Sequence, residues 1–152
     1  MILDDGIRKQ LTEYLSLLEN DVLIKASGGT DDASEDMMSL IHELAALSPK
    51  IKIEQVRLPR TPSFSINHTN EDTGVTFAGI PLGHEFTSLV LALLQVSGRA
   101  PKVDEKLIEQ IKNLKGEYHF ETYVSLSCHN CPEVVQALNL MSILNPGITH
   151  TM

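Results

Sequence analysis

The chain contains two cysteines, Cys128 and Cys131, which lie three residues apart between a predicted strand and a predicted helix. Pro132 favours a helix start here, because a proline in the first turn gives up no intrahelical hydrogen bond. The positive end of the helix macrodipole favours a thiolate, which is the form that attacks a disulfide. The spacing therefore predicts a redox-active dithiol, with Cys128 at the mouth of the helix as the nucleophile and Cys131, one turn further in, as the resolving thiol.

Three other roles for the two cysteines compete with this interpretation. A zinc site needs two more soft ligands, and the nearby candidates in the sequence are His119, His129 and His150. A structural disulfide suits a small secreted chain, but we find no signal peptide, and so short a loop would stabilise little. Two unrelated core cysteines would not explain the strand-to-helix context, so we favour the redox motif.

Composition and charge restrict the possible partners. Of the 152 residues, 42% are hydrophobic, which is enough for one sizeable core or two small ones. The net charge of -8, from 12 Lys plus Arg against 20 Asp plus Glu, disfavours nucleic acid or an anionic membrane as partner. No run approaches the roughly 20 apolar residues that span a bilayer. We expect a soluble, cytoplasmic protein with a protein partner.

Hydrophobic periodicity predicts alternating helices and strands along the chain. Residues 67–74 are rich in turn formers and predict a hairpin between two of the strands. The break at 97–101 predicts a linker. The expected helices cover residues 4–19, 37–47, 82–96 and 103–114, and the expected strands cover 22–26, 51–56, 64–66, 75–77 and 118–126.

The element order from residue 22 to 96 is strand, helix, strand, hairpin and helix, which is the order of a thioredoxin-like fold. The same order begins again at residue 118, and aligning Ser27 with Ser125 places Thr30 opposite Cys128 and Ala33 opposite Cys131. The expected fold class is α/β with two tandem thioredoxin-like folds. Residues 1–97 would form the repeat without cysteines, and residues 98–152 a linker helix and the first half of the redox-active repeat.

Pro62 lies where thioredoxin-like folds place a cis-proline before their third strand. A proline there would otherwise be awkward, because it removes a hydrogen-bond donor from the sheet. We expect the bond before Pro62 to be cis, with a trans proline at the start of a strand as the alternative.

Several longer runs resemble the amino-terminal domain of the F subunit of alkyl hydroperoxide reductase. In that family the domain consists of two fused thioredoxin-like folds, and only the second carries the redox dithiol. The resemblance covers essentially the whole chain and is less distinctive over residues 28–36 and near Asn70. The runs that carry it are residues 83–94, from Gly-His-Glu-Phe onward, and residues 121–123, 125–132 and 135–141, which include Ser-Cys-His-Asn-Cys-Pro.

The resemblance implies a place in an electron relay. A flavin-containing body takes electrons from NADH and passes them to this dithiol, which then reduces the disulfide of a peroxiredoxin that detoxifies hydroperoxides. FAD and NADH are expected in the carboxy-terminal part of the parent protein, outside this chain. The implied partners are the peroxiredoxin subunit and the reductase domain of the same parent chain, which we expect to be a homodimer.

The resemblance also singles out residues around the dithiol. The family places an acidic residue of the cysteine-free repeat near the thiols, and here that residue is Glu85, a possible auxiliary acid or base; the alternative is a solvated glutamate at a helix start. We expect His129, Asn130 and Pro132 to tune the redox poise. His84 is expected to be a surface or packing residue.

The family pattern continues beyond the last residues of this chain. Thr151 and Met152 lie just inside the expected second strand of the active repeat, so we expect a fragment. The open edge of strand 118–126 would then pair with another chain, or the carboxy-terminal part would be mobile. The alternatives in function are a generic glutaredoxin-like oxidoreductase and a non-catalytic docking module for the peroxiredoxin.

Overall fold

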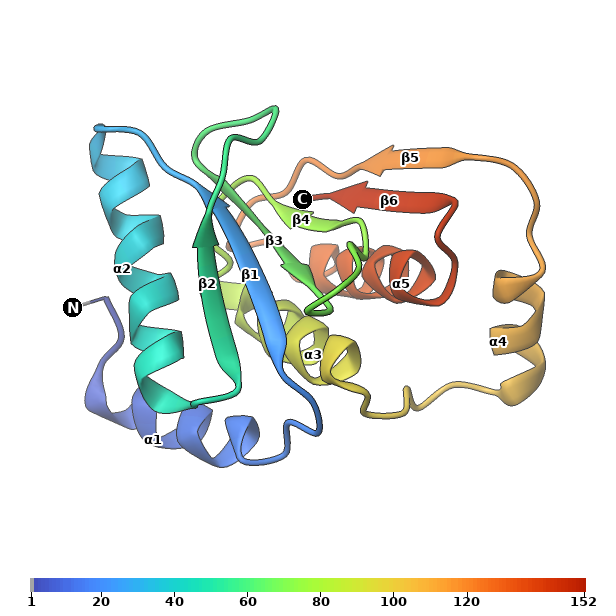
Figure 1. Ribbon diagram of the computed structural model, residues 1–152, viewed down its shortest axis with the longest axis horizontal. Coiled ribbons are helices and arrows are strands. Elements are labelled where there is room, and N and C mark those ends of the chain that lie inside the picture. The colour runs from blue at the N-terminus through green and yellow to red at the C-terminus, as the bar shows by residue number, and fades with distance from the viewer. Residues whose placement is uncertain (1) are drawn as a thin grey trace.

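A mixed sheet of six strands, in the order β2-β1-β3-β4-β6-β5, runs through residues 2–152, the part of the chain that this computed structural model describes (Figure 1). Helices α3 and α5 pack against each other and against the sheet. The strands are β1 (Val22–Ser27), β2 (Ile51–Gln55), β3 (Ser63–Asn67), β4 (Val75–Phe77), β5 (Tyr118–Glu121) and β6 (Ile148–Thr151). The helices are α1 (Asp5–Leu15), α2 (Asp32–Leu47), the short 3-10 helix η1 (Gly83–Glu85), α3 (Phe86–Ser97), α4 (Glu105–Lys112) and α5 (Cys131–Leu144).

The first four strands have the arrangement expected from the sequence. Strands β1 and β2 are parallel and are connected by α2, while β3 runs antiparallel to β1 and forms a hairpin with β4. Every position of β3 is buried, and the rings of Phe64 and Phe77 stack across the hairpin with centroids 5.3 Å apart. The central strands therefore hold the core of the molecule.

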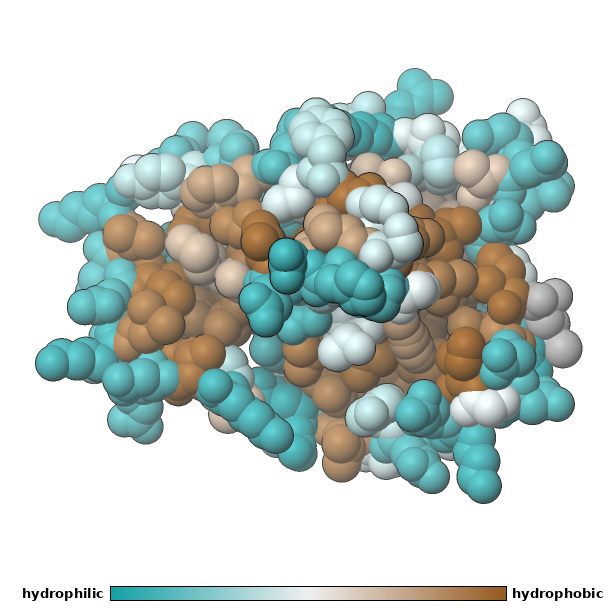
Figure 2. Space-filling model, turned by 180° about the vertical axis from the view of Figure 1, so that it is seen from behind, coloured by the Kyte–Doolittle hydropathy of each residue, from teal (hydrophilic) through white to brown (hydrophobic). Residues whose placement is uncertain are grey.

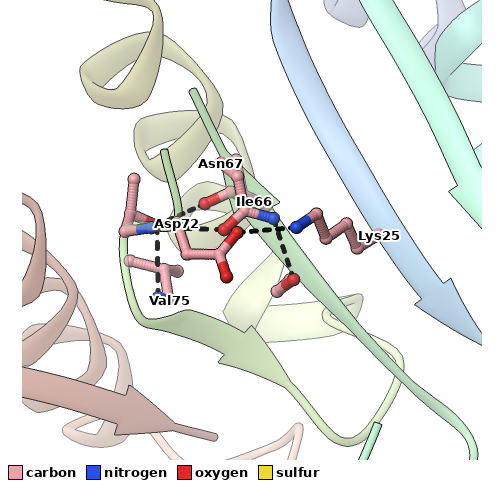
Figure 3. Close-up of polar contacts among 7 residues, drawn as sticks. Lys25, Ile66, Asn67, Asp72 and Val75 are labelled. Carbon is pink, nitrogen blue, oxygen red and sulfur yellow. Dashed lines mark hydrogen bonds and ion pairs between the residues drawn. The ribbon is translucent and has the colours of Figure 1, made fainter. Parts of the chain in front are cut away.

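Side chains hold the turn of the β3-β4 hairpin (Figure 3). The Asn67 side-chain oxygen accepts a hydrogen bond from the Thr73 backbone N–H at 3.2 Å, and the Thr73 hydroxyl donates to the Ile66 carbonyl. From β1, the Lys25 ammonium contacts the Asp72 carboxylate of the turn at 2.8 Å, and this bond raises the pKa of Lys25. Since the ion pair is exposed, the buried bonds hold the turn more firmly than it does.

The carboxy-terminal strands continue the same sheet. Strand β6 runs parallel to β4, with Val75 opposite His150, and β5 runs parallel to β6 at the edge. Gly74 allows this close approach. Its φ is +84°, and a Cβ atom there would lie 3.0 Å from the Ile148 carbonyl oxygen. Helix α5 connects β5 to β6 just as α2 connects β1 to β2 (Figure 1).

Four expected elements are shorter in the structure by more than one residue. The helix expected over 4–19 is α1, residues 5–15. The strand expected over 118–126 ends at Glu121, because the Thr122 N–H makes the last bond to β6, at the Thr151 carbonyl, 2.9 Å away. The α-helix expected over 82–96 begins later, since the φ of +59° at Gly83 is not α-helical. The α-helix therefore begins at Phe86. The helix expected over 103–114 is α4, residues 105–112.

Helix α4 buries little of its apolar stripe. Ile111 is buried, whereas Leu107 and the following Leu114 are exposed. Figure 2 shows hydrophobic side chains at the end of the molecule that carries this helix. We call the exposed set the α4-β5 patch; it comprises Val103, Leu107, Leu114, Tyr118 and Phe120. Within residues 2–152, no helix is both long enough and apolar enough to cross a membrane.

Candidate redox site

The two cysteines form a disulfide just before helix α5. The Cys128 and Cys131 Cα atoms are 5.5 Å apart, and both residues are half-buried. Helix α5 begins at Cys131, with Asn130 as its N-cap and Pro132 in the first turn. Cys128 therefore lies three residues before the first residue of α5, at the mouth of the helix. The Cys128 N–H donates a hydrogen bond to the Ser125 carbonyl at 3.0 Å. This turn keeps Cys128 in the loop before the helix.

His129, between the cysteines, contacts the other half of the chain. Its imidazole meets the ring of His84 edge to face, with centroids 4.6 Å apart. Both histidines are exposed. His84 is thus a surface residue, as expected. It also contacts the redox motif, and the sequence did not indicate this contact because the two histidines lie far apart along the chain.

Glu85 is fully buried, so the alternative of a solvated glutamate is wrong. One carboxylate oxygen accepts a hydrogen bond from the Ser88 hydroxyl at 2.7 Å, and the Gln136 amide on α5 donates to that hydroxyl at 3.3 Å. The second carboxylate oxygen, Oε2, has no hydrogen-bond partner among the described residues. Glu85 is therefore buried against α5, the helix that begins at Cys131. Burying a carboxylate with one oxygen unpaired costs free energy.

His150 is a buried residue whose surroundings the sequence did not reveal. Its Nδ1 lies 2.7 Å from the Asn139 side-chain oxygen, and its Nε2 lies 2.9 Å from the Thr122 hydroxyl. Burial lowers the pKa of His150 to about 4. The neutral ring ties β6 to α5 and to the end of β5. The one signal in the sequence was a polar residue at a strand position that alternation would bury.

A cavity of about 550 Å³ separates the cysteine-free half from the loop that follows β5. Pro62 lines it, and the Thr61–Pro62 bond is cis. At its rim, Glu121 accepts a hydrogen bond from the Tyr123 hydroxyl and pairs with Arg60, each at 2.8 Å. These contacts lower the pKa of Glu121, the Tyr123 bond most. The second half is thereby held beside the cis-proline.

A smaller cavity of about 260 Å³ opens beside the disulfide. Tyr123, Val124 and Val134 line it together with Cys131. Tyr123 is 83% exposed. An apolar hollow next to a redox sulfur can receive an extended segment of a protein partner.

The described residues show no group of three or more His, Cys, Asp or Glu side chains arranged to hold a metal ion. Of the histidines considered as zinc ligands, His119 bonds Thr149 at 2.7 Å and His150 is buried in its own network. The glycine pair after β1 does not fit a dinucleotide either. The Asp31 carboxylate caps α2 there, bonding the Ser34 N–H at 3.3 Å, and would repel a pyrophosphate.

The fold defines the class of protein. The chain superimposes on the NTD_N/C domain of the alkyl hydroperoxide reductase AhpF from Enterococcus faecalis with a TM-score of 0.86 and 29% identity, covering 99% of this chain and 79% of that one. A protein disulfide oxidoreductase from Aeropyrum pernix shares the fold, with a TM-score of 0.86 at 23% identity. The chain therefore has a mixed α/β thioredoxin-like fold with a disulfide at a helix start, the arrangement of a thiol-disulfide redox protein.

Sequence relatives identify the family. No family model matches the chain. The F subunit of alkyl hydroperoxide reductase from Staphylococcus aureus is 56% identical over 151 residues, and a Bacillus subtilis protein named NADH dehydrogenase is 67% identical over 152 residues. The chain belongs to the family of the alkyl hydroperoxide reductase F subunit and matches its amino-terminal domain. It spans about 30% of the length of these relatives.

Proposed function

We propose that this chain carries electrons from a flavin- and NADH-dependent reductase body to the disulfide of a peroxiredoxin, as part of an NADH-dependent alkyl hydroperoxide reductase. The observation that carries the proposal is the half-buried Cys128–Cys131 disulfide at the start of α5, beside an apolar cavity. The names of the relatives support the same chemistry.

The reaction consists of two thiol-disulfide exchanges. In the reduced chain, the Cys128 thiolate attacks one sulfur of the partner's disulfide, which forms a mixed disulfide and releases one partner thiolate. The Cys131 thiolate then attacks the Cys128 sulfur, which re-forms the intramolecular disulfide and releases the second partner thiolate. Two electrons pass to the partner, and the two protons lost by the cysteines balance those that its thiolates take up.

Neighbouring residues have supporting roles in this proposal. Cys128 lies before the positive end of α5, which favours its thiolate. Pro132 favours the helix start, and Asn130, the N-cap residue, makes no side-chain capping bond and is left to tune the redox poise. His129 adds a ring beside the nucleophile. Glu85 is an auxiliary acid or base, because its Oε2 atom is buried without a partner among the described residues.

The proposal includes an organisation for the parent protein, which the element order supports. Residues 1–97 form a thioredoxin-like unit without cysteines, and residues 98–152 supply a linker helix and the β5-α5-β6 unit of a second such fold. FAD and NADH belong to the reductase domain of the parent chain, outside these residues. The parent is proposed to be a homodimer that docks the peroxiredoxin subunit at this domain.

Single cysteine variants test the proposal. The pre-reduced chain is expected to convert a peroxiredoxin disulfide stoichiometrically to thiols. Cys128→Ser abolishes the transfer, whereas Cys131→Ser stops at a mixed disulfide that can be trapped and located by mass spectrometry. A chain that binds the peroxiredoxin but leaves its disulfide oxidised would be a docking module. That result would refute the proposed electron transfer.

A further inference from the structure

One short segment of the cysteine-free half touches the redox motif at three successive points. The segment is residues 83–88, from η1 into the first turn of α3. It contacts the loop before Cys128, the residue between the two cysteines, and the helix after Cys131. No other segment within residues 22–97 makes a hydrogen bond or a ring contact with residues 124–136.

The first contact is through the backbone. The His84 N–H donates to the Leu126 carbonyl at 3.0 Å, two residues before Cys128. Gly83 permits this approach, because a Cβ atom there would lie 2.9 Å from the same carbonyl oxygen, and its φ of +59° suits glycine. This is the one backbone hydrogen bond between residues 123–130 and the described part of the first half.

The second and third contacts involve side chains. The His84 ring meets the His129 ring edge to face at 4.6 Å, a geometry that aromatic rings favour. On the far side of the disulfide, the buried Ser88 hydroxyl accepts a hydrogen bond from Gln136 of α5 at 3.3 Å. Thus the loop that holds Cys128 and the helix that holds Cys131 are fixed to the same segment.

We infer that Gly83 and His84 form a clamp that keeps Cys128 within reach of Cys131 during exchange, which makes His84 a positioning residue. The inference rests on the proposed function and adds a part to it. While Cys128 carries a partner's sulfur, the intramolecular disulfide no longer ties the loop to the helix. The clamp then maintains the effective concentration of the Cys131 thiolate at the Cys128 sulfur, and the resolving step depends on that concentration.

A small aromatic disulfide, dithiobis(nitrobenzoate), separates the two steps. The reduced chain releases one thionitrobenzoate when Cys128 forms the mixed disulfide and a second when Cys131 resolves it, so stopped-flow absorbance records two phases. In His84→Ala the second phase is expected to slow by about threefold to tenfold, with the first phase nearly unchanged. His84→Phe keeps an aromatic ring against His129 and restores the rate. Gly83→Ala slows the second phase, because its Cβ displaces the loop.

The matched control is His42→Ala, which removes an exposed histidine from α2 and leaves both phases unchanged. A second phase as fast in His84→Ala as in the unaltered chain overturns the inference, and so does a His84→Phe variant as slow as His84→Ala. A failure of the proposed function would give a different result. The unaltered chain would then complete both phases but would leave a peroxiredoxin disulfide unreduced.

Discussion

His150 shows how one buried side chain makes the fold sensitive to acid. Both ring nitrogens are satisfied by neutral partners, Asn139 and Thr122, and the ring has no exposed surface. Adding a proton would place a charge between groups that the neutral ring already satisfies. Desolvation therefore lowers the pKa of His150 from 6.5 to about 4.

Stability is predicted to fall in mild acid because of this residue. Below pH 6.5 the unfolded chain takes up a proton at His150, while the folded chain does so only near pH 4. The contribution of His150 is therefore complete above about pH 6.5 and is lost as the pH falls toward 4, about 3 kcal/mol at most. Urea unfolding measured across this range checks the slope. His150→Gln should flatten it and the exposed His42→Gln should not; equal slopes for both variants would contradict the assignment.

The disulfide at a helix start was predictable because a motif of two cysteines before a helix is local. The backbone turn at Cys128 and the burial of Glu85 were not. Cys128 lies outside the helix because of a backbone turn, and Glu85 is buried by a helix from the other half of the chain. The contact between His84 and His129 likewise depends on how two segments pack, and no pattern in either segment indicates it.

At the scale of elements, the β4-β6 pairing joins the two halves of the sheet. The His150 N–H donates to the Gly74 carbonyl at 2.9 Å, and the Met152 N–H donates to the Thr76 carbonyl at 3.0 Å. The two halves approach closely at Gly74, because its backbone lies against β6 and has a positive φ.

Replacing this glycine should weaken the junction. Gly74→Ala places a Cβ atom 3.0 Å from the Ile148 carbonyl in a left-handed conformation, and we expect a loss of about 1 to 3 kcal/mol. Hydrogen exchange should show faster exchange at His150 and Met152 than at the β1-β3 amides. Gly79→Ala is the control, since a Cβ atom at Gly79 would meet nothing within 4 Å. If both variants have the same stability, the junction is not limited by Gly74.

Most elements were predictable from periodicity, and their ends were not. Alternation at residues 64–66 and 75–77 predicted the β3-β4 hairpin, because one face of each strand must be buried. The strand that begins at Tyr118 pairs with β6 over four residues, and its own sequence gives no sign of how far that pairing extends. The 3-10 turn before Phe86 follows from the φ of Gly83, which apolar spacing does not reveal.

At the scale of the whole molecule, one edge of the sheet stays open. Strand β5 pairs with β6 on one side and with no strand of residues 2–152 on the other. All four of its residues are exposed, and the α4-β5 patch lies beside it. Unpaired backbone groups next to apolar side chains favour pairing with another chain.

The chain is therefore predicted to self-associate through β5. Its sedimentation coefficient should rise with protein concentration, and Phe120→Lys should suppress the rise by placing a charge at the edge. Tyr14→Lys, which alters an exposed aromatic residue on α1, is the matched control and should leave the association unchanged. A single species over the whole concentration range, with protected amides in β5, would show that the edge is not used.

The segment of residues 83–88 precedes both cysteines in the chain, and this order has a consequence during translation. The ribosome completes the four strands β1 to β4 and helix α3 before it makes Cys128. When the thiols leave the exit tunnel, the surface that holds them has already been synthesised. The cysteine-free half is therefore made before the thiols, and it can provide the surface against which their segment folds.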